Sequence, residues 1–68
     1  MKHVVEYTER ELGWGGEVWY TEYDTLNEAN AMVKDTNDKN VSKTAPSYYI
    51  IAKYMGLLST TPKGYKIF

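Results

Sequence analysis

Residues 47–55 form the longest apolar, β-prone run of the sequence, and Pro46 and Gly56 bound it. β-branched and aromatic side chains suit a pleated, half-covered surface, so this run predicts a strand. Successive side chains of a strand point to opposite faces, and both faces are apolar here, with Ile50 on one and Ile51 on the other. Other elements must therefore cover both faces of this strand at least in part.

The length of 68 residues and the absence of cysteine limit how the chain can be stabilised. A chain of this size buries roughly 60% of its unfolded surface, which leaves a small margin of stability. Disulfides and thiolate metal sites are excluded, so an aromatic-rich core or self-association must compensate. Seven Tyr, two Trp and one Phe provide the aromatic side chains. We expect one domain over residues 1–68.

Two strands and a turn are predicted in the N-terminal part. Residues 2–10 and 17–23 are both rich in β-branched and aromatic side chains. Between them stand Gly13, Gly15 and Gly16, and glycine adopts positive φ without steric cost, as a sharp reversal requires. This pattern predicts a β-hairpin.

A helix is predicted to follow the hairpin. Thr25 and Glu28 have the spacing of a capping box, in which Thr25 accepts from the amide of Glu28 and the Glu28 side chain reaches back to the amide of Thr25. The apolar stripe at helical spacing consists of Leu26, Ala29, Met32, Val33 and Thr36. The helix should end within residues 37–40, and residues 64–68 should form a short last strand.

The predicted order β-β-α-β(-β) indicates an α+β fold with a three- or four-stranded antiparallel or mixed sheet. The third strand must run parallel to the second, so the first strand should lie between them, antiparallel to both. The last strand would add beside the third, giving the order 2-1-3-4, with the helix on one face. The second strand would then be an edge, open to pairing with a second copy of the chain.

Charge is distributed unevenly along the chain. Residues 1–28 carry seven acidic side chains against Lys2 and Arg10, whereas residues 39–68 carry five lysines and no acid. Opposite charges on paired strands stabilise a sheet, so the two halves of the chain are expected to attract each other in the fold. Charge separation of this size is also evidence about association with other molecules.

The residues that carry chemistry in enzymes are scarce. His3 is the only histidine, and no nucleophile motif is present. We expect no enzymatic activity, no cofactor and no resident metal. Met1, Lys2 and His3 could form a square-planar nitrogen site for Cu(II) or Ni(II), but only if the amide of His3 is not part of a strand.

The predicted hairpin carries the first candidate binding site. Trp14 stands at its tip among acidic residues, and Trp and Tyr dominate the energetics of protein interfaces. Trp14 could instead fold back onto the edge of the sheet. As a binding site, the hairpin would suit a basic groove of a host protein or protein complex, including a groove that normally holds nucleic acid. The candidate residues are Glu9, Glu11, Trp14, Glu17, Trp19 and Glu22.

A second candidate site lies in the lysine-rich half. Aromatic side chains on a sheet with nearby lysines can stack single-stranded bases. The residues of this alternative nucleic-acid surface are Lys43, Tyr49, Lys53, Tyr65 and Lys66. The isoelectric point near 5.7 and the single arginine count against it.

The chain resembles small inhibitor proteins of bacteriophages and mobile elements, including anti-CRISPR proteins. The resemblance rests on the strands at residues 4–8, 17–23 and 48–54, the cap at residues 25–28, and the lack of cysteine. It implies an inhibitor that acts by binding host machinery in the host cytoplasm. Residues 1–5 lack the apolar run of a signal peptide, and we find no apolar stretch of the ~18 residues that a membrane span needs.

Overall fold

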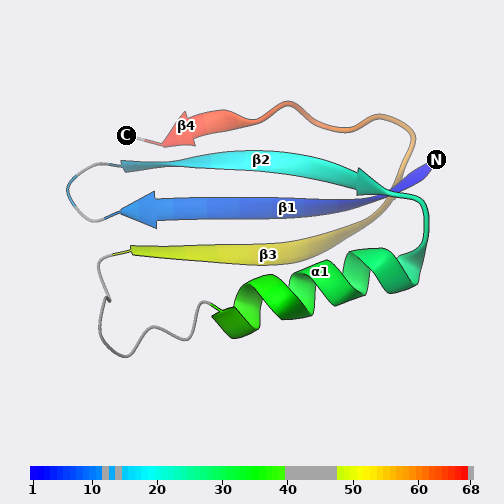
Figure 1. Cartoon of the computed structure of the whole chain (residues 1–68). Coiled ribbons are helices and arrows are strands. Elements are labelled where there is room, and N and C mark those ends of the chain that lie inside the picture. Colours follow the sequence, from blue (N-terminus) through cyan, green and yellow to red (C-terminus); the bar gives the residue numbers. More distant parts are fainter. Residues whose placement is uncertain (12, 14, 40–47, 68) are drawn as a thin grey trace.

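The two N-terminal strands form the centre of a four-stranded sheet (Figure 1). The structure, a computed structural model, describes residues 1–11, 13, 15–39 and 48–67. The elements are β1 (Lys2–Glu11), β2 (Gly15–Tyr23), α1 (Leu26–Lys39), β3 (Tyr48–Leu58) and β4 (Tyr65–Ile67). The sheet has the order β3-β1-β2-β4 with every neighbouring pair antiparallel, and α1 packs on one of its faces. The α+β class is confirmed.

The hairpin of β1 and β2 forms where the glycines predicted it. Gly13 and Gly15 have φ angles of 89° and 81°, in the left-handed region that glycine adopts at no steric cost. The strands then pair without interruption from Glu11↔Gly15 to His3↔Tyr23. Because the register is fixed along the whole hairpin, it decides which side chains share a face.

The position of β1 between β2 and β3 is confirmed, but the fourth strand lies elsewhere than predicted. β4 pairs with β2, through Val18↔Tyr65 and Gly16↔Ile67, and not with β3. Residues 59–64 therefore cross the end of the sheet and run back along β2 (Figure 1). Gly64 permits a close approach there, since a Cβ at this position would lie 2.4 Å from the carbonyl oxygen of Val18.

The new position of β4 changes which strand is an edge. The hydroxyl of Thr61 donates to the carboxylate of Glu22 at 2.5 Å, so the return segment also contacts β2 beyond β4. β2 is therefore not the open edge that pairing between copies through this strand would need. The predicted order 2-1-3-4 leaves β2 as an edge because it puts the last strand beside β3, whereas the observed order is β3-β1-β2-β4.

Helix α1 occupies the outer edge of β3 through one side chain. The amide nitrogen of the Asn37 side chain donates to the carbonyl oxygen of Ala52 at 3.0 Å, and the backbone nitrogen of Ala52 donates to Oδ1 of Asn37 at 2.9 Å. The Asn37 amide thus pairs with both backbone groups of one residue, as a neighbouring strand would. An occupied edge is protected from pairing with another chain, and it explains why β4 is found on the other side of the sheet.

We expect Asn37→Ala to lower the free energy of unfolding by about 1–2 kcal/mol, because two hydrogen bonds to the edge of β3 are lost. Asn30→Ala is the matched control, since Asn30 is exposed on the same helix and forms no hydrogen bond within the described residues. Both changes gain the same helix propensity. Equal urea midpoints for the two variants would contradict the role assigned to Asn37.

The start of α1 follows the predicted capping box in part. The amide of Glu28 donates to the hydroxyl oxygen of Thr25 at 3.1 Å, as expected. The Glu28 carboxylate does not reach back to the amide of Thr25 but accepts from its hydroxyl at 3.1 Å.

In the part of the chain that the structure describes, no helix is long and apolar enough to cross a bilayer.

The main core lies between α1 and the sheet. Its buried members are Val5, Tyr7, Ala29 and Ala52. Tyr7 is central: its ring stacks on Trp19 with the centroids 5.6 Å apart, and its hydroxyl lies 2.7 Å from that of Tyr23. Burial first, and then the hydrogen bond to Tyr23, raise the pKa of Tyr7 far above its ordinary value.

Only part of the predicted helical stripe is covered. Ala29 is fully buried and Val33 packs against the core, whereas Leu26 and Met32 remain 46% and 37% exposed. The helix packs mainly against β3 and much less against β1 and β2. Because α1 lies along β3 at one side of the sheet, part of its apolar stripe is exposed. For the same reason α1 leaves the part of its own sheet face formed by β2 largely open (Figure 1).

Candidate functional site

Three acidic side chains meet at the hairpin end of the sheet. Glu9 and Glu17 are directly opposite each other in the β1–β2 register, and Glu11 lies two residues beyond Glu9 on the same strand. Odd-numbered residues of β1 share the face of Tyr7, which is the face that carries α1. We call Glu9, Glu11 and Glu17 the acidic hairpin patch. The register therefore brings together three of the predicted partner-binding residues.

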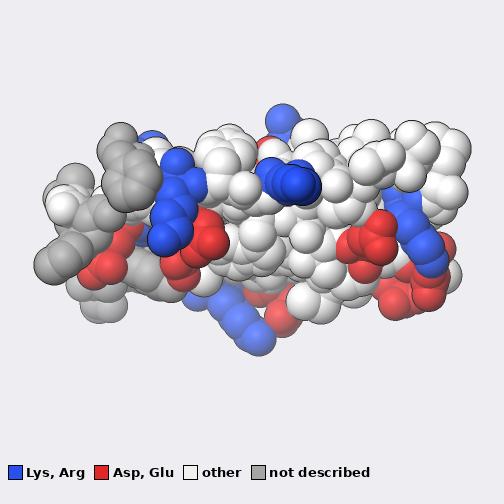
Figure 2. Space-filling model, turned by 90° about the horizontal axis from the view of Figure 1, so that it is seen from above, with Lys and Arg blue, Asp and Glu red and all other residues white. Residues whose placement is uncertain are grey.

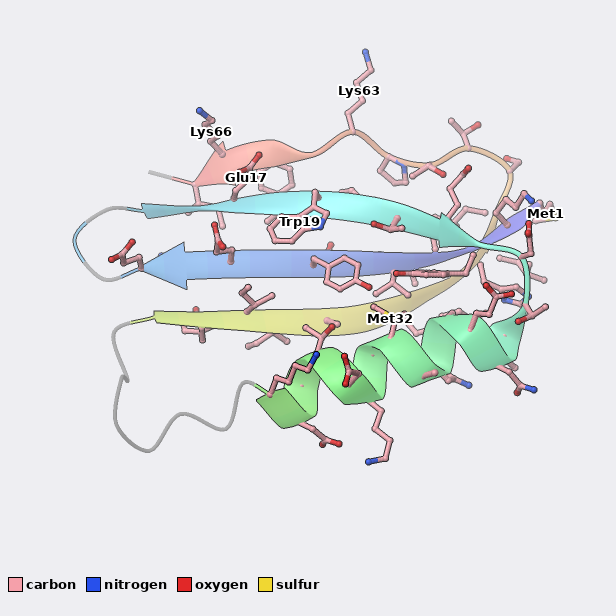
Figure 3. All side chains as sticks on the ribbon, in the orientation of Figure 1. Met1, Glu17, Trp19, Met32, Lys63 and Lys66 are labelled. Atoms are coloured by element: carbon pink, nitrogen blue, oxygen red, sulfur yellow. The ribbon has the colours of Figure 1, made fainter. Side chains whose placement is uncertain are left out.

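Trp19 borders this patch but belongs partly to the core. It lies two residues from Glu17 on the same face of β2, and its ring stacks on Tyr7 at an interplanar angle of 11° (Figure 3). The side chain is half-buried. Its exposed part adjoins Glu17, so Trp19 can contribute apolar contact at the border of the acidic hairpin patch. Trp14, predicted at the tip of the hairpin, lies outside the described residues.

Glu22 does not join the other acidic residues of the predicted site. It is five positions from Glu17 in the same strand, and an odd separation places the two side chains on opposite faces. It also lies near the opposite end of β2, where its carboxylate accepts the hydroxyl of Thr61. Glu22 is close to the other hairpin acids along the sequence, but the alternation of side chains in β2 separates the two faces of the hairpin.

The alternative nucleic-acid surface is divided between the two faces. Tyr49, Lys53 and Tyr65 lie on the face opposite α1, whereas Lys66 lies on the face of α1, opposite Glu17 in the β2–β4 register. Lys53 is opposite Glu6 in the β1–β3 register. Lys43 lies outside the described residues. The lysines and tyrosines thus do not form one continuous basic surface in the part of the chain that the structure places.

The same registers place opposite charges from the two halves of the chain on paired strands. Glu6↔Lys53 and Glu17↔Lys66 each place an acid of the N-terminal half opposite a lysine of the C-terminal half. Cross-strand pairs of opposite charge stabilise a sheet by a few tenths of a kcal/mol to about 1 kcal/mol. Glu17 therefore has one like-charged neighbour, Glu9, and one oppositely charged neighbour, Lys66.

Other surface charges are already compensated by near neighbours. On α1, Lys34 pairs with Asp38 at 2.8 Å and Lys39 with Asp35 at 3.0 Å. At the start of β1, Lys2 pairs with Asp24, and this hydrogen bond lowers the pKa of the Asp24 carboxyl. Glu11 and Glu17 have no ion-pair partner among the residues described.

The charges are also distributed unevenly between the two sides of the molecule. Figure 2 looks onto the β4 edge, with the side of α1 at the bottom, and most of the acidic side chains lie in its lower half. The opposite face, along the top of the view, shows mainly uncharged surface with a few basic side chains. Acidic side chains thus lie at both ends of the α1 side, and the acidic hairpin patch is at one of these ends.

The described residues do not cluster the side chains that bind metal ions. No group of three His, Cys, Asp or Glu side chains among them is placed to hold a metal ion. His3 lies within β1, paired with Tyr23 on one side and Leu57 on the other, and its Nδ1 lies 2.8 Å from the hydroxyl of Tyr54. The condition for a copper or nickel site at the N-terminus, a residue 3 outside any strand, is therefore not met.

Comparisons with known proteins give no match: no family model, no curated protein and no solved structure is significantly similar to this chain.

Proposed function

We propose that the protein is a non-enzymatic binding module that uses the acidic hairpin patch to occupy a basic site on a partner protein. One observation carries the proposal: the register sets Glu9 directly opposite Glu17, with Glu11 on the same face, at the end of the sheet. The hairpin does not require two carboxylates to lie opposite each other in order to form. Because Glu9 and Glu17 do so, they create a compact negative surface on two paired strands.

The energetics of the patch favour an external cation. Glu11 has no ion-pair partner in the part of the chain that the structure describes, and Glu17 has only Lys66 as an oppositely charged neighbour in register. A basic partner would add favourable charge pairs with these two exposed carboxylates. Complementary charge would also accelerate the encounter with a basic partner.

The narrower form of the proposal is that the occupied site normally binds nucleic acid, as for a phage-type inhibitor of a host protein. Side chains two residues apart on one strand face are separated by about 7 Å, so Glu9 and Glu11 present a repeating negative charge along β1. A groove lined with lysine and arginine for phosphates would accept such a row. Trp19 would add apolar contact at its border.

The test compares two variants of equal charge. The first carries Glu9→Gln, Glu11→Gln and Glu17→Gln, and the second carries Glu22→Gln, Asp35→Asn and Asp38→Asn. Each variant loses three negative charges, but only the first loses the acidic hairpin patch. We expect the first to weaken binding to a protein captured from nuclease-treated bacterial lysate by about threefold to a hundredfold, since three exposed charge pairs at roughly 0.2–1 kcal/mol each contribute roughly 0.6–3 kcal/mol. The second should bind within about twofold of the wild type.

Two results would count against this function. If both variants lost affinity equally, net charge and not the hairpin would govern binding. If capture depended on nucleic acid in the lysate, the protein partner would not be the direct ligand. For the narrower proposal, the wild-type protein should also compete with nucleic acid for the captured partner.

A further inference from the structure

The face of the sheet opposite α1, here the far face, carries an apolar row that crosses all four strands. Ile51 of β3, Thr8 of β1, Val18 of β2 and Tyr65 of β4 are neighbours in register. Val18 is 2% exposed, but Ile51 and Tyr65 at the two ends of the row are 47% and 56% exposed. The row is thus buried at Val18 and open to solvent at its two ends.

No element in the described part of the chain packs over this row. α1 contacts the other face through Val5, Tyr7 and Ala52, and residues 59–64 cross the sheet at the end farthest from the hairpin (Figure 1). Ile51 and Tyr65 therefore leave exposed apolar surface at both edges of this face, and exposed apolar surface on one face is a feature of interaction sites. The polar residues on either side of the row indicate what covers it.

We propose that a second copy of this chain covers the far face, related to the first by a two-fold axis that runs across the strands along the Ile51–Tyr65 row. Such an axis places each residue of the row on the same residue of the second copy. Residues two positions before the row then meet residues two positions after it. A two-fold interface uses the same patch on both copies, so the patch must be complementary to itself. On each strand, the residue two positions before the row must therefore suit the residue two positions after it.

On β1, the self-complementarity is electrostatic. Glu6 and Arg10 flank Thr8, both on the far face. The axis sets Glu6 of each copy against Arg10 of the other, which gives two symmetry-related ion pairs near the centre of the interface. Glu6 is held ready for this contact, because its carboxylate accepts the hydroxyl of Tyr20 at 2.9 Å.

On β2, the self-complementarity is one of size. Tyr20 and Gly16 flank Val18, so the ring of Tyr20 meets a residue without a side chain in the other copy. The Arg10 side chain lies against Gly16, since a Cβ on that glycine would be 3.1 Å from the Arg10 Cγ. The hydrogen-bonded pair Glu6–Tyr20 of one copy therefore faces the adjacent pair Arg10–Gly16 of the other.

On β3, the matching pair is a cation and an aromatic ring. Lys53 and Tyr49 flank Ile51, and the axis brings the Lys53 ammonium of one copy near the Tyr49 ring of the other, where a cation–π contact is favourable. The central three strands thus each supply one complementary relation. A nucleic acid would instead meet the carboxylates of Glu6 and Glu22 on this face, which count against phosphate binding.

The dimensions and the charge of the molecule permit this dimer. Neighbouring strands lie about 4.8 Å apart, so the four strands span about 14 Å between their outer backbones, and the far face offers an interface at the small end of the range for specific complexes. Two sheets packed face to face lie about 10 Å apart, with their strands within about 30° of alignment. The net charge of −1 causes little repulsion between copies.

The test is a charge exchange followed by sedimentation equilibrium. The wild-type chain of 7.9 kDa should sediment with twice that mass at micromolar to millimolar concentration. Glu6→Arg and Arg10→Glu should each weaken self-association by about tenfold or more, because each sets like charges against each other at two places. Lys34→Glu, which changes charge at an exposed position of α1 on the other side of the sheet, is the control and should dimerise normally.

Mixing the two single variants provides the decisive result. In the mixed dimer, Glu6 faces Arg10 and the new Arg at position 6 faces the new Glu at position 10, so all pairs are complementary again. We expect a heterodimer to form from two variants that are each monomeric, which an unfolded variant could not produce. A monomeric wild type, or single variants that dimerise as well as the wild type, would overturn the proposal, whether or not the far face then proved to bind nucleic acid or another protein.

Discussion

Replacing Tyr7 by Ala should remove a large part of the free energy of unfolding. Tyr7 is 6% exposed at the centre of the core, with its ring stacked on Trp19 and its hydroxyl hydrogen-bonded to Tyr23. Truncation of a large buried aromatic residue to Ala costs about 3–5 kcal/mol. A domain of 68 residues has a total stability of roughly 3–10 kcal/mol at 0.05–0.15 kcal/mol per residue. The expected loss is therefore a large part of the whole.

Tyr7→Phe separates packing from hydrogen bonding. It keeps the ring against Trp19 and removes only the hydroxyl next to Tyr23, so we expect a loss of about 1 kcal/mol. Urea unfolding followed by tryptophan fluorescence, to which Trp19 contributes, measures both variants. If Tyr7→Ala unfolded at the same urea concentration as Tyr7→Phe, the stacked pair would not be the centre of the core.

Gly16→Ala should destabilise the hairpin by about 3 kcal/mol, at the upper end of the cost of overpacking. A Cβ at Gly16 would lie 2.1 Å from the carbonyl oxygen of Glu9. The conflicting atom belongs to the backbone of β1 and cannot rotate away, so the strands must separate locally. Gly16 also pairs with Ile67, so β4 should loosen together with the hairpin end.

Gly13→Ala is the matched control for Gly16→Ala. A Cβ at Gly13 has no atom within 4 Å, but its φ of 89° is unfavourable for alanine, at a cost of about 1 kcal/mol. Urea midpoints should therefore rank wild type above Gly13→Ala and Gly13→Ala above Gly16→Ala. The reverse order of the two variants would show that the strands are not in such close contact at Gly16.

Local signals were sufficient to predict most of the elements and the central strand order. The alternation of residues 2–10 and 17–23 around three glycines predicted the hairpin, and Thr25 predicted the start of α1. Chain direction then required β1 between β2 and β3. These features depend on short-range chemistry and on connection length, both of which the sequence contains.

The position of β4 depends on contacts that have no local signal. A strand of three residues fits either edge of the sheet equally well by propensity. The edge of β3 is occupied by Asn37, and Gly64 allows the close approach to β2. Asn37 was considered only as part of the end of the helix, because a side chain that replaces a strand is recognisable only once the helix is placed beside that strand.

The composition of the candidate site was partly predictable from the alternation of side chains. Glu17 and Glu22 are separated by an odd number of residues, so a regular strand places them on opposite faces. The pairing of Glu9 with Glu17 required more, because the first residue of β2 sets the register and the glycines allow several starting points. The division of Lys66 from Tyr65 likewise follows only once residues 65–67 are known to be extended.

The most direct test of the proposed function is a map of amide chemical shifts in the 68-residue protein, recorded with and without the captured partner. We expect the largest changes at Glu9, Glu11 and Glu17, with smaller changes at Trp19. The far-face residues Tyr49, Lys53 and Tyr65 should keep their shifts. Changes confined to those far-face residues, with the acidic hairpin patch unaffected, would contradict the account.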